Sequence, residues 1–376
     1  MRAAILFLSL FLALIPAPAA FAETPAAESA SAGMSVPAEL RTSFSIPEPT
    51  VLSVACGGMI RGTARGEIFD QCAAKLSEWT GGKVTLNLYD GGILGSNEEM
   101  LEALSAGTVD LLMSNQSGLY SMIPELGALS VYGLHSDLES YNAALSSFTR
   151  DLEPCFAREG LHLTALYCES FNQFTTLSSL NDADSLSRIR IRVISDPYHE
   201  AFWRCTGAEP VEMPSVNSYI GIQQGRFNAV ELNGFAISDS QLYNVQKYLA
   251  DFRYIPSFSV VTASTRTWDS LDKETRAALT QMFEYKRDLE ISYYETQNRQ
   301  NRQFARDHGM YVITSMPVAL RWVFDAASQE VIVLLRERLG NDGYTDAVKP
   351  PVRRTGNRKS GPEGTGIYAA EPPSRR

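Results

Sequence analysis

Strand-like and helix-like segments alternate along most of the chain, and this alternation constrains the fold more than any other feature. Residues 84–88 place an apolar side chain at every second position, which is the pattern of a half-buried strand. Residues 67–79 instead repeat their apolar side chains at the spacing of one helix face. Strands that alternate with helices predict β–α–β units, and therefore an α/β fold with a largely parallel sheet.

The other elements continue this rhythm. The expected strands are 51–56, 84–88, 109–114, 161–168, 188–193, a short one from 211, 227–232, 255–263 and 311–314. The expected helices are 67–79, 97–106, 138–158, 197–205, 215–225, 237–249 and 317–338. Residues 270–308 are also helical in pattern and contain neither Pro nor Gly. About 38 helical residues would span roughly 57 Å, so we expect this helix to lie across two domains or to break into two.

Both ends of the chain differ in composition from this body. An apolar run at 3–15 precedes Ala20-Phe21-Ala22, which has the small–x–small form of an export-signal cleavage site. The run is too short to span a bilayer, so we expect cleavage after Ala22 and a periplasmic location. Residues 23–48, rich in Ala, Ser, Pro and Glu, predict a flexible leader. Residues 345–376 predict a disordered basic tail, either a solvated end or a contact for a polyanion or membrane surface.

Charge and length exclude some classes of protein. The chain has 376 residues, of which 44% are hydrophobic, which predicts two packed domains. It carries 33 basic and 43 acidic side chains, a formal net charge of −10. Seven of the basic side chains lie after residue 344, so the body is more acidic still. An acidic body argues against a nucleic-acid partner, because neutralising phosphates requires a basic face.

No motif in the sequence indicates catalysis or metal binding. There is no GxSxG elbow, no HExxH and no Gly-rich phosphate loop, and the four histidines stand far apart. We therefore expect no cofactor, no metal and no enzymatic activity. An exported location permits one or two disulfides, with at least one thiol left over from the odd count. The five cysteines are Cys56, Cys72, Cys155, Cys168 and Cys205.

Three arginines mark the strand at 188–193. Arg188, Arg190 and Arg192 occupy alternate positions, so they share one face of the strand. For Arg188 and Arg190, a solvated sheet edge is an equally good interpretation. Arg192 lies at the carboxyl end of the strand, where ligands bind in open α/β sheets. A guanidinium group there can hold a carboxylate through two parallel hydrogen bonds.

Short motifs spread over residues 50–340 complete the pattern. They are Trp79–Val84 (WTGGKV), Gly92–Gly95 (GILG), Glu98–Leu101 (EEML), Leu104, Gly107–Asp110 (GTVD), Arg190–Val193 (RIRV), Gly207–Met213 (GAEPVEM), Tyr219, Gln223–Gly225 (QQG), Glu231 and Val245–Leu249 (VQKYL). Each motif alone is weak. In this order and spacing they resemble the substrate-binding proteins of TRAP transporters, the DctP-like family.

The resemblance implies a two-domain periplasmic-binding-protein clamp, with crossing strands and a long interdomain helix. Domain 1 would comprise residues 49–170 and 258–297, and domain 2 residues 171–257 and 298–344. The family's proteins close over a small organic acid, whose carboxylate is clamped by the arginine at the position of Arg192. The partners implied are this ligand and the membrane subunits of a TRAP transporter, and the receptor is expected to be a monomer.

The sequence departs from the family pattern at three positions in the expected pocket. Gln173 replaces a second ligand-facing arginine. Leu232 replaces a ligand-facing asparagine, unless Asn233 substitutes for it. Asn217 replaces a glutamate that stands two residues before the position of Tyr219. These changes remove charge, and they favour a monocarboxylate ligand with an apolar part.

Further side chains are candidates for contact with the ligand. Asn115 and Asn172 carry amides that can donate to a carboxylate or hydroxyl. Glu169 is either an acid facing the cleft or a hinge residue in water. Phe174, together with Phe171 and Trp203, packs either on the ligand or in the core.

Three other functions remain open from the sequence. An ABC-type solute-binding protein would use the same closure around a ligand. An extracytoplasmic sensor input would also bind a ligand, but would pass the signal to a receptor. A secreted hydrolase would need catalytic acids that the motifs do not indicate.

Overall fold

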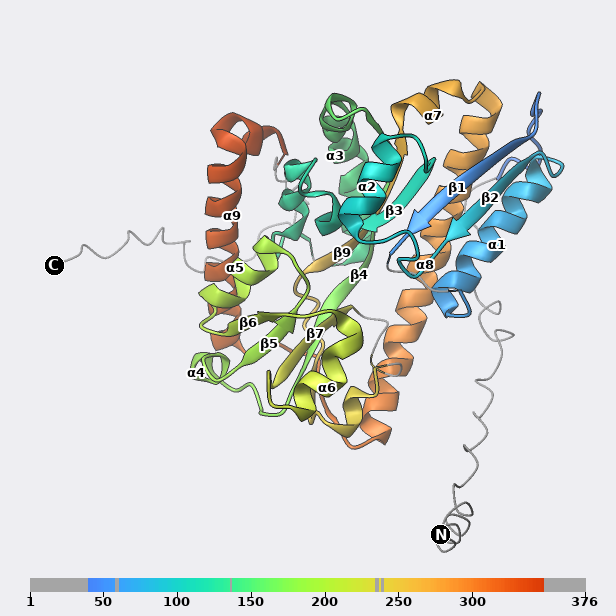
Figure 1. Ribbon diagram of the computed structural model, residues 1–376. Helices are drawn as coiled ribbons and strands as arrows, with labels where there is room; N and C mark the ends of the chain where they lie inside the picture. Colours follow the sequence, from blue (N-terminus) through green and yellow to red (C-terminus); the bar gives the residue numbers. More distant parts are fainter. Residues whose placement is uncertain (1–39, 58–60, 136, 234–236, 238–239, 348–376) are drawn as a thin grey trace, which may run out of the picture.

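The computed structural model describes residues 40–57, 61–135, 137–233, 237 and 240–347. They form the expected α/β fold, in which a curled mixed sheet joins two groups of strands (Figure 1). The strand order is β2-β1-β3-β9-β4-β7-β5-β6, with β8 also pairing with β4 and β10 with β8. The two groups lie at opposite ends of the molecule, and β4 and β9 run between them.

The first group is a parallel arrangement around β1. Strand β1 pairs with both β2 and β3. Helices α1, α2 and α3 belong to this half of the chain, as do two short 3₁₀ helices. The bounds are β1 Thr50–Cys56, α1 Ala64–Trp79, β2 Val84–Tyr89, α2 Asn97–Ser105, β3 Leu111–Asn115, η2 Gln116–Leu119, η3 Pro124–Ser130 and α3 Leu138–Arg158.

The second group is built around β5 and β7. Strand β5 pairs in parallel with β6 and β7, and β7 pairs antiparallel with β4. The bounds are β4 Leu161–Thr176, α4 Ala183–Leu186, β5 Arg190–Val193, α5 Pro197–Cys205, β6 Glu209–Glu212, η4 Ser215–Asn217, α6 Ser218–Gln223, β7 Ala229–Asn233, η5 Leu242–Asn244 and β8 Tyr248–Ala250. The remaining elements are β9 Pro256–Ser264, α7 Thr265–Ser270, α8 Lys273–Asp307, β10 Tyr311–Ile313 and α9 Val318–Ala347.

The middle of the sheet differs from the prediction of a largely parallel sheet. The pairs β3–β9, β9–β4 and β4–β7 are all antiparallel. This follows from the two crossing strands, because β4 leaves the first group and β9 returns to it in the opposite direction. The parallel pairing predicted from the β–α–β rhythm holds for the flanks.

The long helix forms as one unbroken element after a separate first turn. Helix α7 ends at Ser270, and Asp272 then caps α8 by accepting hydrogen bonds from the backbone nitrogens of Glu274 and Thr275. Helix α8 packs against α1, β4 and β10, so it runs beside both groups of strands (Figure 1). Its position agrees with the expectation of a helix that lies across the two halves.

Several segments depart from the predicted elements. Helix α9 runs to Ala347, past its predicted end at 338 and into the segment 345–376 that was expected to be a disordered tail, of which residues 348–376 lie outside the described residues. The helix expected at 237–249 is replaced by η5 and by strand β8, which pairs with β4 and β10. This pairing uses the backbone of residues 248–250 and outweighs their helix-like pattern. Residues 40–48, expected to belong to a flexible leader, instead pack on the fold. Phe44 and Ile46 are buried, and the Phe44 nitrogen donates to the Trp79 carbonyl at 2.8 Å.

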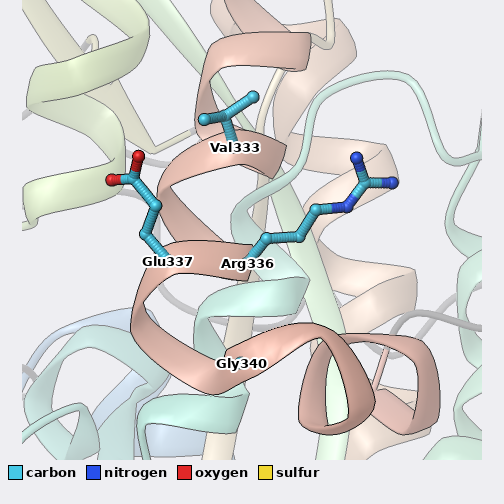
Figure 2. Close-up of a pocket in the computed structure, with 4 residues that line it drawn as sticks. All are labelled: Val333, Arg336, Glu337 and Gly340. Atoms are coloured by element: carbon cyan, nitrogen blue, oxygen red, sulfur yellow. The ribbon is translucent and has the colours of Figure 1, made fainter.

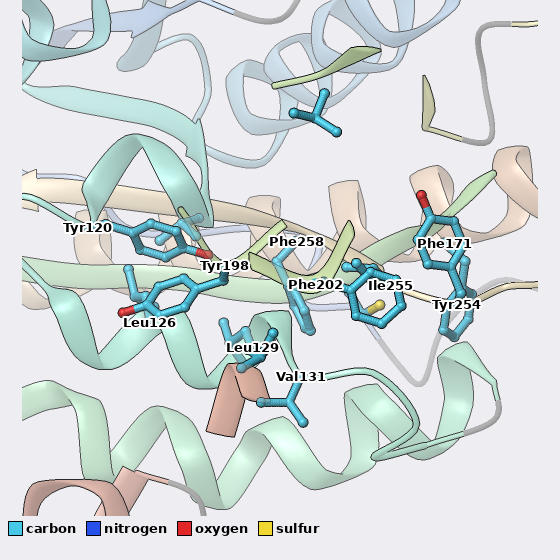
Figure 3. Packing of buried hydrophobic residues seen from close by; sticks show 14 of the residues in the cluster. Tyr120, Leu126, Leu129, Val131, Phe171, Tyr198, Phe202, Tyr254, Ile255 and Phe258 are labelled. Carbon is cyan, nitrogen blue, oxygen red and sulfur yellow. The ribbon is translucent and has the colours of Figure 1, made fainter. Parts of the chain in front are cut away.

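The largest buried cluster belongs to both groups of strands. It includes Leu112 of β3, Phe174 of β4, Ile191 of β5, Phe202 of α5 and Phe324 of α9. Figure 3 shows its aromatic side chains packed between the strands and the neighbouring helices. Helix α9 packs against α5 and η3, and so bridges the second and the first half. No helix in the described part of the chain combines the length and apolar composition needed to cross a bilayer.

Gly127 of η3 lies close against Tyr198 of α5. A Cβ atom on Gly127 would lie 2.3 Å from the Tyr198 ring, far inside van der Waals distance. Gly127→Ala is therefore expected to destabilise the protein by about 1–3 kcal/mol, as overpacking of a core does. Urea denaturation followed by circular dichroism would measure this as a lower midpoint, and an unchanged midpoint would contradict the packing.

Candidate ligand-binding site

Arg192 is a buried cation held by backbone carbonyls. It is 3% exposed and lies next to the end of β5. Its Nε donates to the Met213 carbonyl at 2.6 Å, and its Nη1 donates to the Glu231 carbonyl at 3.1 Å. Burial lowers the pKa of Arg192, although the Glu231 carboxylate opposes this effect. Arginine nevertheless keeps its charge in proteins, so the sheet carries an oriented guanidinium group at this point.

The register of the strands decides which predicted residues share a face with Arg192. Arg192 is paired with Val230, and Gln173 is paired with Leu232. Because side chains alternate between the two faces of a sheet, Arg192, Leu232 and Gln173 lie on one face. The structure therefore places two of the three departures from the family pattern, Gln173 and Leu232, in the same row of side chains as the arginine.

Gln173 lies at the end of this row of side chains, where it contacts α8. Its Nε2 donates to Asn298 Oδ1 at 2.5 Å, and both side chains are buried. The Oε1 atom of Gln173 is buried and has no hydrogen-bond partner among the described residues. Asn298 was not singled out from the sequence. The sequence feature that could have indicated Asn298 is the helical spacing of the buried face of α8. Asn298 and Asn301 continue the buried stripe that includes Tyr294.

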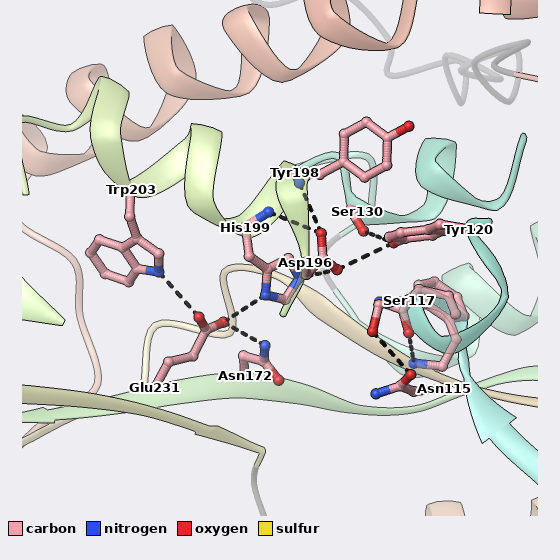
Figure 4. A network of polar contacts seen from close by, with 12 residues as sticks. Asn115, Ser117, Tyr120, Ser130, Asn172, Asp196, Tyr198, His199, Trp203 and Glu231 are labelled. Carbon is pink, nitrogen blue, oxygen red and sulfur yellow. Dashed lines mark hydrogen bonds and ion pairs between the residues drawn. The ribbon is translucent and has the colours of Figure 1, made fainter. Parts of the chain in front are cut away.

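The opposite face of the same strands carries a polar network around Glu231 (Figure 4). Asn172 Nδ2 donates to Glu231 Oε1 at 2.6 Å, and Trp203 Nε1 donates to Oε2 at 3.2 Å. His199 Nδ1 lies 3.2 Å from Oε1 as an ion pair. Burial alone would raise the pKa of Glu231, but His199 and Asn172 lower it. Asn172 is thus engaged with Glu231, on the face away from Arg192.

The aromatic candidates lie in the core. Phe174 is fully buried, and its ring contacts Trp203 at 5.1 Å and Tyr254 at 5.7 Å between centroids. Phe171 and Trp203 are buried as well. This burial favours the interpretation of Phe171, Phe174 and Trp203 as core aromatics over a contact with ligand.

Four polar candidates lie apart from the buried row. Asn115 is exposed and caps η2 by accepting from the Gly118 nitrogen at 3.0 Å. Asn217 is exposed at the end of η4, and Tyr219 is partly exposed in α6. Asn233 is partly exposed and lies opposite Asn172 on the Glu231 face. The described contacts do not bring these four side chains to Arg192.

Glu169 takes part in a buried ion-pair cluster. It lies in the middle of β4, which continues to Thr176, and it is 3% exposed, so it is not a hinge residue in water. Its Oε2 lies 2.6 Å from Arg65 Nη2 of α1, and Ser257 donates to Oε1 at 3.4 Å. Burial raises the pKa of Glu169, and Arg65 partly offsets this. The sequence did not indicate Arg65 or its second partner, Glu290 of α8.

Two open surface hollows lie against α9 instead. One has a volume of about 470 Å³ and is lined by Val333, Arg336, Glu337 and Gly340 (Figure 2). The Arg336 and Glu337 side chains point to opposite sides of the helix. The other, of about 250 Å³, lies between residues 131–134 and α9. No residue predicted from the sequence to bind ligand lines either cavity.

Two further expectations concern cysteines and metals. All five cysteines fall in the described part of the chain and none is joined to another, so the disulfides that export would permit are not formed there. Cys56, Cys72 and Cys168 are buried separately in the core. Within the described residues, no group of His, Cys, Asp and Glu is arranged to hold a metal ion.

Similarity to known proteins agrees with the fold and the motifs. The family described as bacterial extracellular solute-binding protein, family 7 (DctP) matches residues 61–333. The 2,3-diketo-L-gulonate-binding periplasmic protein YiaO of Escherichia coli is 25% identical over 206 residues, which are 54% of this chain and 63% of that protein. The C4-dicarboxylate-binding protein DctB of Bacillus subtilis is 25% identical over 241 residues, covering 63% and 69%. The chain thus spans less than two thirds of the E. coli relative.

Solved structures share the whole architecture. A TRAP periplasmic solute binding protein from Ochrobactrum anthropi has a TM-score of 0.73 at 22% identity, covering 80% of this chain and 94% of that chain. The sugar acid binding protein DctPAm from Advenella mimigardefordensis, in complex with galactonate, has a TM-score of 0.70 at 18% identity, covering 80% and 97%. The expectation of a binding protein rather than an enzyme is confirmed by the family. The chain belongs to the family 7 bacterial extracellular solute-binding proteins, the DctP family.

Proposed function

We propose that the protein is the solute receptor of a TRAP-type transporter and that it captures a small organic acid, with Arg192 as the anchor for the carboxylate. The observation that carries this proposal is the buried guanidinium group of Arg192, oriented by two carbonyls. Carbonyls do not neutralise its charge, and among the described residues no carboxylate forms an ion pair with it. A ligand carboxylate would supply the missing negative charge.

The named ligands of relatives support this class of ligand. The two curated relatives are named for 2,3-diketo-L-gulonate and for C4-dicarboxylates, and the solved structures include complexes with galactonate, L-gulonate and succinate. For this chain we propose a monocarboxylate with an apolar part. The reason is the row beside Arg192, where Leu232 is apolar and Gln173 is neutral.

The rest of the proposal concerns closure and location. Residues 49–170 with 258–297, and 171–257 with 298–344, are proposed to close on the ligand as two domains about β4, β9 and α8. A ligand stabilises the closed form only by its greater affinity for that form. We further propose periplasmic export with cleavage after Ala22, which lies outside the described residues, and a monomeric receptor that delivers its ligand to the TRAP membrane subunits.

A thermal-shift panel tests the anchor. Succinate, galactonate, L-gulonate, and aromatic and aliphatic monocarboxylates are each added to the wild type, to Arg192→Ala and to Arg190→Ala. Arg190 is the matched control, because it lies on the same strand face but is exposed and donates to the Gly225 carbonyl. A ligand at 100 times its Kd should stabilise the wild type and Arg190→Ala by about 2.7 kcal/mol. It should leave Arg192→Ala unchanged.

The panel also separates the two levels of the proposal. Stabilisation by a monocarboxylate but not by succinate would support the narrower ligand class. Stabilisation by succinate alone would contradict the monocarboxylate class but would still agree with Arg192 as the anchor for a carboxylate. Equal shifts in the wild type and Arg192→Ala would show that Arg192 is not the anchor.

A further inference from the structure

The Glu231 residue connects the anchor to the opposite face of the sheet. Its backbone carbonyl accepts from Arg192 Nη1 at 3.1 Å. Its carboxylate points to the other side and is held by Asn172, Trp203 and His199 (Figure 4). Since the carbonyl and the carboxylate belong to one residue of a short strand, fixing the carboxylate restricts the carbonyl that orients the guanidinium group.

His199 is the charged member among the partners of this carboxylate. It is buried in α5, with Nδ1 at 3.2 Å from Glu231 Oε1 and Nε2 at 3.6 Å from Asp196 Oδ2. Burial alone would lower the pKa of His199, but Asp196 and Glu231 raise it to about 9. The imidazole therefore lies as a cation between two carboxylates, one on its own helix and one on β7.

Asp196 fixes the far side of this imidazole. Its Oδ1 caps α5 by accepting from the backbone nitrogens of Tyr198 and His199 at 2.9 and 3.1 Å. Its Oδ2 faces His199 and also accepts from the Tyr120 hydroxyl at 3.3 Å. Tyr120 in turn contacts Ser130 Oγ at 2.6 Å. Tyr120 and Ser130 follow β3 in the first half of the chain, so contacts from both halves set the position of His199.

We propose that His199 is a positioning residue for the ligand anchor: held between Asp196 and Glu231, it fixes the Glu231 carbonyl that orients the Arg192 guanidinium group. This proposal rests on the proposed role of Arg192 as the anchor. His199 itself lies on the face of the sheet away from Arg192, so it acts through Glu231 and does not touch the ligand.

Among the charged and titratable groups around His199, the His199 ring itself is the group expected to titrate near pH 9. The facing charges are Asp196 of α5 and Glu231 of β7. The Tyr254 hydroxyl interacts with Glu231, and burial raises the pKa of Tyr254 well above its usual range. The Tyr120 hydroxyl reaches Asp196, and burial raises its pKa well above the usual range, so it stays neutral. Arg338 of α9 interacts with the neighbouring Tyr198.

The test reads the Arg192 guanidinium directly by NMR and needs no ligand. The Arg192 Nη1–H resonances are assigned by their loss in Arg192→Lys, and the His199 ring signal by its loss in His199→Gln. In the wild type, we expect the Arg192 resonances to shift together with the His199 ring as the pH rises through about 9. In His199→Gln at pH 7, we expect the Arg192 Nη1 protons, one of which is donated to the Glu231 carbonyl, to exchange with water at least tenfold faster, with an unchanged far-UV spectrum.

His162→Gln provides the matched control. His162 is half-buried and stacks on Trp268 in the first half of the molecule, so the same substitution there should leave Arg192 exchange unchanged. Equal exchange rates in folded His199→Gln and in the wild type would overturn the proposal. If His199→Gln does not fold, the wild-type titration decides, because an Arg192 resonance that stays fixed while the His199 ring titrates would also overturn it. Failure of the ligand panel would leave this readout unaffected.

Discussion

Lys286→Met is expected to lower the free energy of unfolding by about 3–5 kcal/mol at pH 7, the cost of breaking a buried ion pair on one side. Lys286 is fully buried in α8, with Nζ at 2.6 Å from Glu290 Oε1 and 2.9 Å from the Tyr167 hydroxyl. Tyr167 also donates to Glu290 Oε2 at 2.6 Å. Without the ammonium group, the cation left beside the Glu290 carboxylate within the described residues is the more distant Arg65, with Nε at 3.8 Å.

The pH dependence of this loss identifies its cause. Burial would raise the pKa of Glu290, but Lys286 and Arg65 lower it below the usual range. The ionised carboxylate therefore contributes stability above its unfolded pKa, near 4.3, and this is lost as the pH falls through the folded value. In Lys286→Met the buried carboxylate is less well compensated, so the deficit should shrink toward pH 4 as Glu290 takes up a proton.

Urea denaturation at pH 7 and pH 4 would measure both effects. Lys75→Met is the matched control, because Lys75 forms an exposed ion pair with Glu78 at 2.8 Å, and its denaturation midpoint should not change measurably. The double variant Lys286→Met with Glu290→Gln should recover part of the loss, because no buried charge is then left unpaired. A deficit of under 1 kcal/mol in Lys286→Met would contradict the role assigned to the pair.

The local sequence pattern was sufficient to predict those helices and strands that are determined by their own residues. Helix α3 occupies Leu138–Arg158 as predicted, because its apolar spacing is regular and Asp137 caps it by accepting from the Ser140 nitrogen. Strand β4 was predicted only to residue 168. Its continuation through Thr176 is buried and carries polar residues such as Asn172 and Gln173, so it has no alternating pattern to read. What supports it is pairing with β7, β8 and β9, which local pattern cannot reveal.

The same limit applies to the site. Arg192 could be singled out as a candidate from the sequence, because the strand pattern and the family motif both point to it. Its neighbours were less accessible, since Gln173 meets Asn298 across 125 residues of chain. The partners of Glu231 come from α5 and β4, and a lone histidine in a helix gives no sign that two carboxylates will enclose it. Buried polar contacts between distant segments therefore form the part of the site that sequence patterns did not predict.

The stability of the wild type should fall as the pH rises from about 6.5 to about 9, and His199→Gln should remove this part of the fall. The folded pKa of His199, about 9, lies above its unfolded value near 6.5, so between these values the native state binds the extra proton. The contribution is fully present below pH 6.5 and is lost as the pH rises through about 9. At about 1.4 kcal/mol per pH unit, it amounts to on the order of 3 kcal/mol.

Urea denaturation of both proteins at intervals from pH 6 to pH 9.5 would measure this contribution as a difference between the two curves. Other groups that titrate in this range are common to both proteins, so the gap in stability should be widest at pH 6 and should close toward pH 9.5. His162→Gln should not give this pattern, because burial lowers the pKa of His162 and its contribution has the opposite sign. A gap that stays constant across the range would mean that His199 does not carry a proton between Asp196 and Glu231, and the positioning role would then have to rest on packing alone.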